Sequence, residues 1–546
     1  MTMLLSMLLA LSTSQDSPLP MGSRASAATV YAPWGTTSTR WGDQGNGTYI
    51  NPVVNADFSD PDVIRVGTTY YMVASDFNYM GIQVLESKDL VNWRLVSQVY
   101  DHLEGYDSMD HYAKGSWAPA LAFHDGLFYV YFCTPDEGLF MATATDAHGP
   151  WTPLHCVRRV KGWEDPCPFW DDDGQAYLGH SLVGAGPIII HKMSSDGRHL
   201  LDEGATVYTG PVAEGTKFLK LQGHYYLVIP EGGVSTGWQT VLRAKSVWGP
   251  YQKRIMLEQG LTPINGPHQG NLVSTPDGEW WLLHFQETTD RGRVVHLQPV
   301  RWTDGWPSAG ADLDLNGIGE PVKVWPKPSI ADTTPSPTLH QQLSDEFSGD
   351  VLTYKGQRRD GLSLQWQWNH NPVHTHWSLT ERKGWLKLCA LPADELRHAR
   401  NTLSQKIMGY KGEAMVQIDG KSLAEGTRAG LCVLGSKYVG VGLTRNGGKL
   451  RFYIETAVAP TRRQQHSFHT ELLSVAPATA YLKIVANNGM FQLLYSTDGR
   501  TFHEAAPAIE VATANWKGPR IGLYCYNTAD KGGEAYFNFF RYRADH

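Results

Sequence analysis

A short polar turn with glycine, followed by an aromatic-rich apolar run, occurs five times in the first half of the chain. The glycines are Gly67, Gly126, Gly174, Gly223 and Gly278, so successive repeats are 59, 48, 49 and 55 residues apart. Glycine supplies the positive φ of a tight hairpin, and aromatic and β-branched residues fit a pleated, half-buried strand. A repeat of this length, built from short strands and turns, is typical of a β-propeller blade. The five repeats predict a five-bladed β-propeller.

The same repeat places one distinctive side chain seven to ten residues before each glycine, where the first strand of each blade is expected to begin. These side chains are Asp60, Trp117, Asp165, Glu214 and His268. The first strand of a propeller blade lines the central channel, so equivalent positions converge on one rim of it. Each acid taken alone fits an ordinary turn or surface residue. Three acids at one blade position instead predict a shared pocket.

The chain after the repeats has a different pattern. A proline-rich stretch over residues 326–337 predicts a linker, which we place at 326–340. Beyond it, strand-like runs follow one another without crossover helices, and the Asn446-Gly447 and Asn488-Gly489 pairs are strong hairpin signals. The sequence therefore predicts an all-β protein, with a propeller over residues 49–325 and a β-sandwich over residues 341–546.

Composition and charge narrow the range of functions. The chain has 546 residues and a formal net charge of −7 without a basic cluster, which argues against nucleic acid as a partner. No run approaches the 18 apolar residues of a membrane-spanning helix, so no membrane partner is expected. The 19 Trp and 25 Tyr suit stacking on sugar rings, although aromatic blade cores account for part of them. The six cysteines form no close pair, which excludes a standard zinc or thioredoxin-type motif.

Residues 1–48 form an N-terminal segment with features of a signal peptide. Residues 4–11 resemble a short apolar core, and Ala25-Ser26-Ala27 has the small residues of a cleavage site. However, no positive charge precedes the apolar run, and Met21 offers a second start. Localisation therefore stays open, with secretion or a periplasmic location among the alternatives.

Three carboxylates around one pocket have a clear chemical use. Glycoside hydrolysis needs two carboxyl groups across a sugar-sized pocket, one protonated to donate to the leaving oxygen and one ionised to activate water or attack carbon. A third carboxylate beside the acid raises the pKa of its neighbour and holds it in place through hydrogen bonds.

Four motifs resemble glycoside hydrolase family 43, and they occur in the order found in that family over about 275 residues. They are Ser59-Asp60-Pro61-Asp62 within the stretch from Asn51 to Gly67, then Ser116-Trp117-Ala118-Pro119, Glu164-Asp165-Pro166 and Ala213-Glu214-Gly215-Thr216. The resemblance implies a five-bladed propeller that hydrolyses β-xylosides and α-L-arabinofuranosides with inversion.

The resemblance also implies roles for single residues. Asp60 is the expected general base, Glu214 the general acid, and Asp165 the residue that tunes the pKa of Glu214 and orients it. Arg293 matches an arginine that reaches the substrate. His268 matches a histidine at the channel centre, close to a bound calcium ion or its waters. Phe77 and Trp117 are candidate walls of the pocket, with packing inside the blades as the alternative.

Residues 341–546, which open with Leu343-Ser344-Asp345-Glu346-Phe347, resemble the concanavalin-like C-terminal sandwich of the family's xylosidase-like members. In those proteins the sandwich helps to close the pocket, which favours exo-action on xylo-oligosaccharides or arabinoxylan fragments. This chain departs from the commonest family sequence at two places. The expected base lies in Asp-Pro-Asp, where many members have Asp-Pro-Ser, and the expected acid lies in Glu-Gly-Thr, where many members have Glu-Gly-Pro. The preference between xyloside and arabinofuranoside therefore stays open.

Two other functions compete with an exo-glycosidase. An endo-acting arabinanase needs an open groove, against which the C-terminal sandwich argues. A non-catalytic carbohydrate-binding propeller would lack at least one of the three acids, and all three are present.

Overall fold

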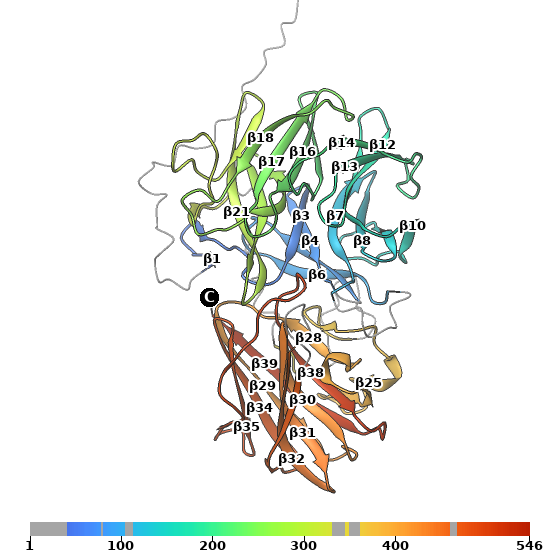
Figure 1. Cartoon of the computed structure of the whole chain (residues 1–546), viewed down its shortest axis with the longest axis vertical. Helices are drawn as coiled ribbons and strands as arrows, with labels where there is room; N and C mark the ends of the chain where they lie inside the picture. The colour runs from blue at the N-terminus through green and yellow to red at the C-terminus, as the bar shows by residue number, and fades with distance from the viewer. Residues whose placement is uncertain are drawn as a thin grey trace, which may run out of the picture.

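The computed structural model describes residues 41–77, 80–103, 113–329, 344–348, 361–458 and 467–545. Within these ranges the chain is almost entirely β-strand, with short 3-10 helices at His374–His376 (η3) and Leu396–His398 (η4). Figure 1 shows an N-terminal half of small sheets stacked on a C-terminal half of larger sheets. The predicted all-β class is confirmed. The predicted signal features and residues 330–340 of the predicted linker lie outside the described residues. No described helix is long and apolar enough to cross a membrane.

In the described part of the N-terminal half, five sheets each contain four consecutive antiparallel strands. They are β3 (Ser59–Val66), β4 (Thr69–Ser75), β5 (Gly81–Ser87) and β6 (Arg94–Tyr100); β7 (Trp117–His124), β8 (Leu127–Thr134), β9 (Gly138–Ala144) and β10 (His155–Arg159); β11 (Trp163–Trp170), β12 (Ala176–Leu182), β13 (Ile188–Met193) and β14 (Ala205–Tyr208); β15 (Lys217–Leu221), β16 (His224–Glu231), β17 (Trp238–Ala244) and β18 (Gln252–Leu257); β19 (His268–Ser274), β20 (Trp280–Thr288), β21 (Gly292–Thr303) and β22 (Trp306–Ala309).

The repeat found in the sequence coincides with these sheets. Each of the five repeat glycines lies between the first and second strand of a sheet, with φ between +62° and +87°. Left-handed backbone of this kind favours glycine, which explains why the residue recurs there. The first strands contact one another in the order β3, β7, β11, β15 and β19, and β19 contacts β3 in turn. The N-terminal half is therefore a propeller-type arrangement of four-stranded sheets.

A three-stranded sheet joins the two ends of this half. Strand β2 (Thr48–Ile50) pairs with β1 (Gly42–Asp43) on one side and with β23 (Val324–Pro326) on the other. Tyr49 faces Trp325 across the second pairing, and Tyr49 is fully buried. This pairing ties the beginning of the propeller-type half to its end.

The C-terminal half contains two larger antiparallel sheets, which confirms the predicted β-sandwich. One has the order β24 (Gln367–Trp368), β28 (Leu403–Lys406), β38 (Arg520–Asn527), β30 (Thr427–Leu434), β31 (Lys437–Asn446), β32 (Lys449–Val458) and β33 (Ser467–Val475), with β27 (Leu391–Pro392) parallel to β38. The other has the order β25 (Trp377–Ser378), β26 (Leu386–Cys389), β39 (Glu534–Ala544), β29 (Lys411–Asp419), β34 (Thr479–Asn487), β35 (Met490–Ser496) and β36 (His503–Glu504), with β37 (Ile509–Glu510) beside β35.

One hydrophobic core fills the sandwich and continues into the propeller-type half. Leu431 and Leu523 of the first sheet pack in the same cluster as Val416 and Phe540 of the second, and so does Val54 near the start of the other half. Two packed sheets must bury their apolar faces against each other, and a shared core fixes the two halves relative to one another. All six cysteines are free, and four of them are buried.

Candidate active site

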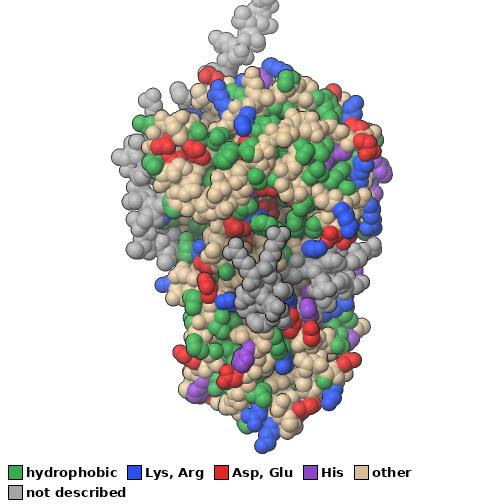
Figure 2. All heavy atoms as spheres, in the orientation of Figure 1, with side chains coloured by type: hydrophobic (Ala, Val, Ile, Leu, Met, Phe, Trp, Pro, Cys, Tyr) green, Lys and Arg blue, Asp and Glu red, His purple; other side chains and the backbone are tan. Residues whose placement is uncertain are grey.

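The five side chains predicted to converge all lie at or near the start of a first strand. Asp60 is the second residue of β3, Trp117 the first of β7, Asp165 the third of β11 and His268 the first of β19, while Glu214 lies three residues before β15. Because these strands contact one another side by side, their starts lie together. Figure 2 shows acidic side chains in a recess of the N-terminal half.

A left-handed backbone residue recurs at this point of every sheet. In four of the sheets the pairing with the second strand is also interrupted there by a bulge. A bulge re-aims a side chain relative to a regular strand, and such residues are held where the surrounding structure fixes them, often at active sites. The left-handed residues are Asp60 (φ 53°), Ala118 (φ 38°), Asp165 (φ 57°), Gly215 (φ 68°) and Gln269 (φ 22°).

Asp60 is held by three donors. Its Oδ2 accepts hydrogen bonds from Ser59 Oγ at 2.8 Å and Ser75 Oγ at 2.5 Å, and its Oδ1 accepts one from Arg293 Nη1 at 2.9 Å. The Asp60 residue is 4% exposed. Hydrogen bonds to a carboxylate from a guanidinium and two hydroxyls are strong and directional, so the carboxylate is fixed in one orientation.

Asp165 accepts hydrogen bonds from residues of three different segments. Its Oδ2 accepts hydrogen bonds from the Gly215 backbone N–H at 2.9 Å and Ser181 Oγ at 3.1 Å, and its Oδ1 accepts one from Gln269 Nε2 at 3.1 Å. Gly215 directly follows Glu214, so Asp165 fixes the backbone that carries the predicted acid. Burial, followed by the charges of Glu214 and Asp60, raises the pKa of Asp165 to about 6.

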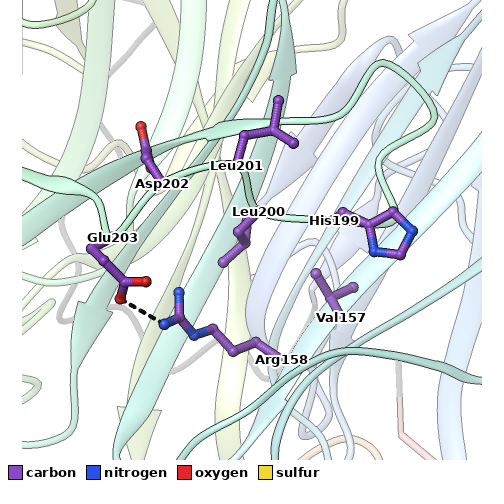
Figure 3. Close-up of a pocket in the computed structure, with 7 residues that line it drawn as sticks. All are labelled: Val157, Arg158, His199, Leu200, Leu201, Asp202 and Glu203. Carbon is purple, nitrogen blue, oxygen red and sulfur yellow. Dashed lines mark hydrogen bonds and ion pairs between the residues drawn. The ribbon is translucent and has the colours of Figure 1, made fainter.

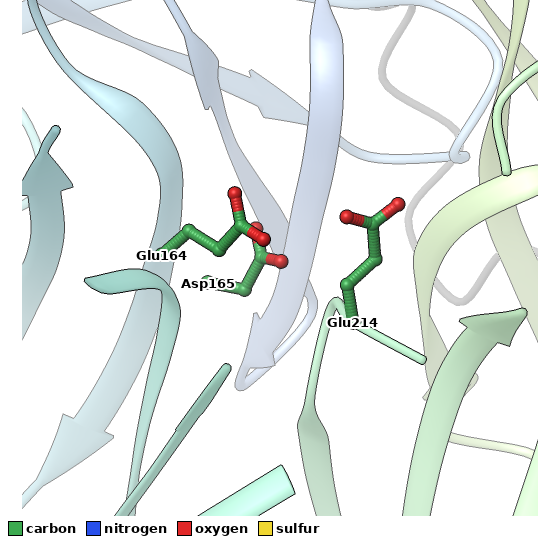
Figure 4. Close-up of side chains that lie close together, drawn as sticks. All are labelled: Glu164, Asp165 and Glu214. Atoms are coloured by element: carbon green, nitrogen blue, oxygen red, sulfur yellow. The ribbon is translucent and has the colours of Figure 1, made fainter. Parts of the chain in front are cut away.

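Glu164 is a fourth carboxyl group at the site, and it is not among the site residues predicted from the sequence. Figure 4 shows it beside Asp165, with Glu214 facing both. One carboxyl oxygen from each of these three residues lies within 4.8 Å of the others. Burial, followed by the charges of Asp165 and Glu214, raises the pKa of Glu164 to about 9. Among the described residues, its one hydrogen-bond donor is the Ala185 backbone N–H, 3.4 Å from Oε1. At neutral pH Glu164 is therefore a neutral carboxylic acid.

Replacing Glu164 by glutamine should stabilise the protein increasingly as the pH rises. The folded-state pKa is about 9 and the reference value is 4.5, so the wild-type stability from this group is present below about pH 4.5 and is lost as the pH approaches 9. Glutamine cannot ionise in either state. The gain in unfolding free energy should grow by up to about 1.4 kcal/mol per pH unit between these limits.

Melting temperatures of both proteins from pH 5 to 9 measure this difference. Glu203→Gln is the matched control, because 88% of the Glu203 side chain is exposed. A gain for Glu164→Gln that stays constant or shrinks with pH would show that Glu164 ionises normally in the folded protein.

Arg293 lies beside Asp60 and also contacts a residue of the sandwich; its role in binding substrate remains a prediction. Its guanidinium contacts Asp60, Ser59 Oγ at 2.8 Å and Glu287 Oε1 at 3.2 Å. The same guanidinium lies 5.4 Å from the ring centroid of Trp516. Trp516 is 48% exposed and belongs to the turn before β38, so an aromatic ring of the sandwich lies beside Arg293, which contacts Asp60. Trp516 is not among the site residues predicted from the sequence.

Phe77 and Trp117 lie against each other. Their ring centroids are 6.2 Å apart in an edge-to-face arrangement, and the Trp117 indole N–H donates to the Ala113 carbonyl at 2.9 Å. Phe77 is 2% exposed, whereas Trp117 is half-buried. Trp117 therefore offers more surface to a ligand than Phe77 does. Their roles as pocket walls remain predictions.

His268 lies next to the predicted acid. Its Nε2 is 3.0 Å from Glu214 Oε1, although the two atoms are not aligned as a hydrogen bond, and its Nδ1 has no hydrogen-bond partner. Among the described residues, Glu164, Asp165 and Glu214 form the one group of three potential metal ligands, and His268 is not in it. Carboxylate oxygens are the ligands that a hard cation such as calcium prefers.

Two hollows elsewhere contain none of these side chains. Figure 3 shows one of about 360 Å³ beside β10, where Arg158 Nη2 pairs with Glu203 Oε2 at 2.7 Å. A second, of about 800 Å³, lies between the two halves and is lined by residues such as Tyr100, Trp151 and Trp377. Neither contains the predicted catalytic side chains, so the carboxyl groups of Asp60, Glu164, Asp165 and Glu214 mark the candidate active site.

Comparison with known proteins shows the family to which this chain belongs. The model of Glycosyl hydrolases family 43 matches residues 49–307, and the model of the Beta xylosidase C-terminal Concanavalin A-like domain matches residues 358–543. A protein of Xylanibacter ruminicola named "Putative beta-xylosidase" is 53% identical over 488 residues, which cover 88% of this chain and 87% of that protein. The chain belongs to glycosyl hydrolase family 43. It is therefore a glycoside hydrolase.

Two further matches to this family 43 chain extend over both halves. The "Beta-xylosidase" of Formosa agariphila is 36% identical over 566 residues, covering 92% of each chain. The crystal structure of the GH43 BlXynB protein from Bacillus licheniformis has a TM-score of 0.77 at 27% identity, covering 91% of this chain and all of that one. The propeller-type half and the sandwich thus occur together in related proteins.

Proposed function

We propose that the protein is an exo-acting, inverting glycosidase that releases xylose, arabinose or both from xylo-oligosaccharides or arabinoxylan side chains. The observation that carries this proposal is the contrast between the two sides of the site. Asp60 is held by a guanidinium and two hydroxyls, whereas Glu214 faces two carboxyl groups with raised pKa values. When two carboxyl groups have such different surroundings, one can stay ionised and act as the base while the other stays protonated and acts as the acid.

In the proposed reaction, Asp60 is the general base and Glu214 the general acid. Asp60 accepts a proton from a water molecule as the water oxygen forms a bond to the anomeric carbon. Glu214 donates its proton to the glycosidic oxygen as the bond from that oxygen to the anomeric carbon breaks. Asp165 orients Glu214 through the Gly215 backbone N–H and tunes its protonation. Water attacks from the face opposite the leaving group, so the configuration inverts.

We propose a closed ring of five blades for the N-terminal half, with the domain limits 49–325 and 341–546. The closed sequence of contacts among the first strands β3, β7, β11, β15 and β19 supports this arrangement. Such a ring places the five strand starts around one channel, as the carboxylate chemistry requires.

Exo-action is supported by the sandwich. The Trp516 ring packs against the guanidinium of Arg293, which contacts Asp60. An aromatic wall at that place favours a pocket that takes the end of a sugar chain over an open groove. The relatives named above are called beta-xylosidases, which favours a β-xyloside as the main substrate. A β-D-xylopyranose and an α-L-arabinofuranose present similar hydroxyl arrangements, so we include activity on both.

Parallel assays on an aryl β-D-xyloside, an aryl α-L-arabinofuranoside and linear arabinan test this function. We expect turnover of one or both aryl pentosides, slow or no cleavage of arabinan, and a first-formed sugar of inverted anomeric configuration by proton NMR. Preferential internal cleavage of arabinan would identify an endo-arabinanase. Binding without cleavage of any of the three would identify a carbohydrate-binding propeller. A retained configuration would exclude the mechanism above.

We also propose a calcium ion beside His268, held mainly by water. The buried Nδ1 of His268 has no hydrogen-bond partner, and a water in the shell of such an ion fits that position. A bound ion would supply positive charge among the carboxylates and brace the first strands. Chelation should then lower the melting temperature and the activity, and calcium should restore both. Indifference of both to the chelator would leave His268 as a structural histidine.

A further inference from the structure

Asp57 is a buried carboxylate at the junction of the two halves. It lies two residues before β3 and is fully buried. Its Oδ1 accepts a hydrogen bond from the Arg293 backbone N–H at 3.0 Å, and its Oδ2 accepts one from the Gly518 backbone N–H at 2.9 Å. A single side chain therefore holds the backbones of two segments that lie more than 200 residues apart in the sequence.

Both segments lead directly into the candidate active site. Arg293 contacts Asp60 through its guanidinium, and Gly518 follows Trp516 by two residues. The segments also touch each other, because a Cβ atom on Gly518 would lie 2.8 Å from the Gly292 Cα. Trp516 has a left-handed backbone (φ 69°), so its turn depends on the contacts that surround it. Any movement of the turn at Gly518 would move the Trp516 ring relative to Arg293.

Buried positively charged side chains lie near the carboxylate of Asp57. Arg520 Nη2 lies 3.8 Å from Asp57 Oδ2. Lys406 and Lys517 are buried nearby, and the negative charges of Asp57 and Asp76 partly offset the burial that lowers their pKa values. A buried carboxylate among buried cations is costly to replace by a neutral group, because the cations lose their compensation.

We propose that Asp57 is a positioning residue that fastens the sandwich turn 516–518 to the Arg293 backbone, so that Trp516, Arg293 and Asp60 form one unit that binds sugar only when the sandwich is docked. This inference rests on the proposed function of the site. Asp57 contacts neither the reacting atoms nor Asp60 itself; it acts through the two backbones that it holds.

Asp57→Asn tests the proposal, because asparagine keeps one acceptor oxygen and turns the other into a donor that opposes a backbone N–H. Thr513→Val is the matched control. It removes a different hydrogen bond between the two halves, just before that turn, from Thr513 Oγ1 to the Thr288 carbonyl at 2.9 Å. We expect Asp57→Asn to raise KM for an aryl β-D-xyloside about tenfold, with a smaller loss of kcat. Thr513→Val should leave KM unchanged.

A double-mutant cycle distinguishes the placing of Trp516 by Asp57 from a general effect of Asp57 on the stability of the protein. If Asp57 acts by placing Trp516, the effect of Asp57→Asn on KM should be mostly lost in a Trp516→Ala background, because the two changes remove the same contact. Additive effects on KM, or an Asp57→Asn variant that only melts at a lower temperature, would overturn the proposal.

Hydrogen exchange measured by mass spectrometry gives a readout that needs no activity. Asp57→Asn should accelerate exchange in peptides containing the Arg293 and Gly518 amides, and Thr513→Val should not accelerate the Arg293 peptide. Unchanged exchange at both amides would overturn the proposal that Asp57 fastens the two segments, even if the enzyme is active. A wild-type protein inert on every pentoside would contradict the proposed function instead, and the exchange data would still decide whether Asp57 fastens the two segments.

Discussion

Asp60→Asn is expected to lower kcat by about 10³-fold on every glycoside that the protein hydrolyses. The attacking water must lose a proton whichever group leaves, and an asparagine amide cannot accept it. The loss should therefore be similar for an aryl β-D-xyloside with a good leaving group and for an unactivated xylo-oligosaccharide. Steady-state kinetics on both substrates measure it. Asparagine has nearly the same shape and can still accept hydrogen bonds from Ser59, Ser75 or Arg293.

Asp62→Asn is the matched control for this change. Asp62 lies two residues further along the same strand, is buried, and accepts hydrogen bonds from the Leu121 backbone N–H and from Asn271 Nδ2. Its replacement should lower the melting temperature, because it also weakens the buried pair with Lys217, but should leave kcat close to the wild-type value. Substantial turnover by Asp60→Asn, or an equal loss in Asp62→Asn, would remove Asp60 from the role of base.

Much of this site could be predicted from the repeat in the sequence. Asp60, Asp165 and Glu214 could be aligned because each precedes a glycine whose positive φ marks the same hairpin in a different sheet. Local backbone chemistry was enough to place them at equivalent points. The sandwich was predictable for a similar reason, since Asn446-Gly447 and Asn488-Gly489 do join consecutive strands, β31 to β32 and β34 to β35.

The position of Glu164 at the site could not be predicted in this way. Adjacent residues in a regular strand point to opposite faces, so an acid next to Asp165 would be expected to point away from the site. The pairing of β11 is interrupted between Glu164 and Cys167, and Asp165 is left-handed, which brings both carboxyl groups to the same side. A bulge of this kind has no reliable signal in a single sequence.

Asp57 and Trp516 depend on tertiary structure. The hydrogen bond between Asp57 and the Gly518 backbone N–H joins residues 461 apart in the sequence, and no local pattern marks either partner. Trp516 is one of 19 tryptophans, and composition cannot tell which of them reaches the site. Both residues follow from how the sandwich docks on the propeller-type half.

Glu214→Ala is expected to separate substrates by their leaving groups. Cleavage of an unactivated xylo-oligosaccharide should fall by about 10²- to 10⁴-fold, because the departing sugar oxygen needs a proton. Cleavage of an aryl xyloside whose phenolate leaves readily should fall much less. Asp60→Asn, which should impair both substrates alike, is the internal comparison measured under the same conditions.

Equal losses on both substrates for Glu214→Ala would show that Glu214 does not protonate the leaving group. Glu164 would then be the next candidate acid, because it is protonated at neutral pH and its carboxyl oxygen lies within 4.8 Å of one from Glu214. The two assignments differ in a measurable way. If Glu214 is the acid, Glu164→Gln should impair both substrates to the same extent, since a neutral amide replaces a neutral acid. If Glu164 is the acid, the loss in Glu164→Gln should depend on the leaving group.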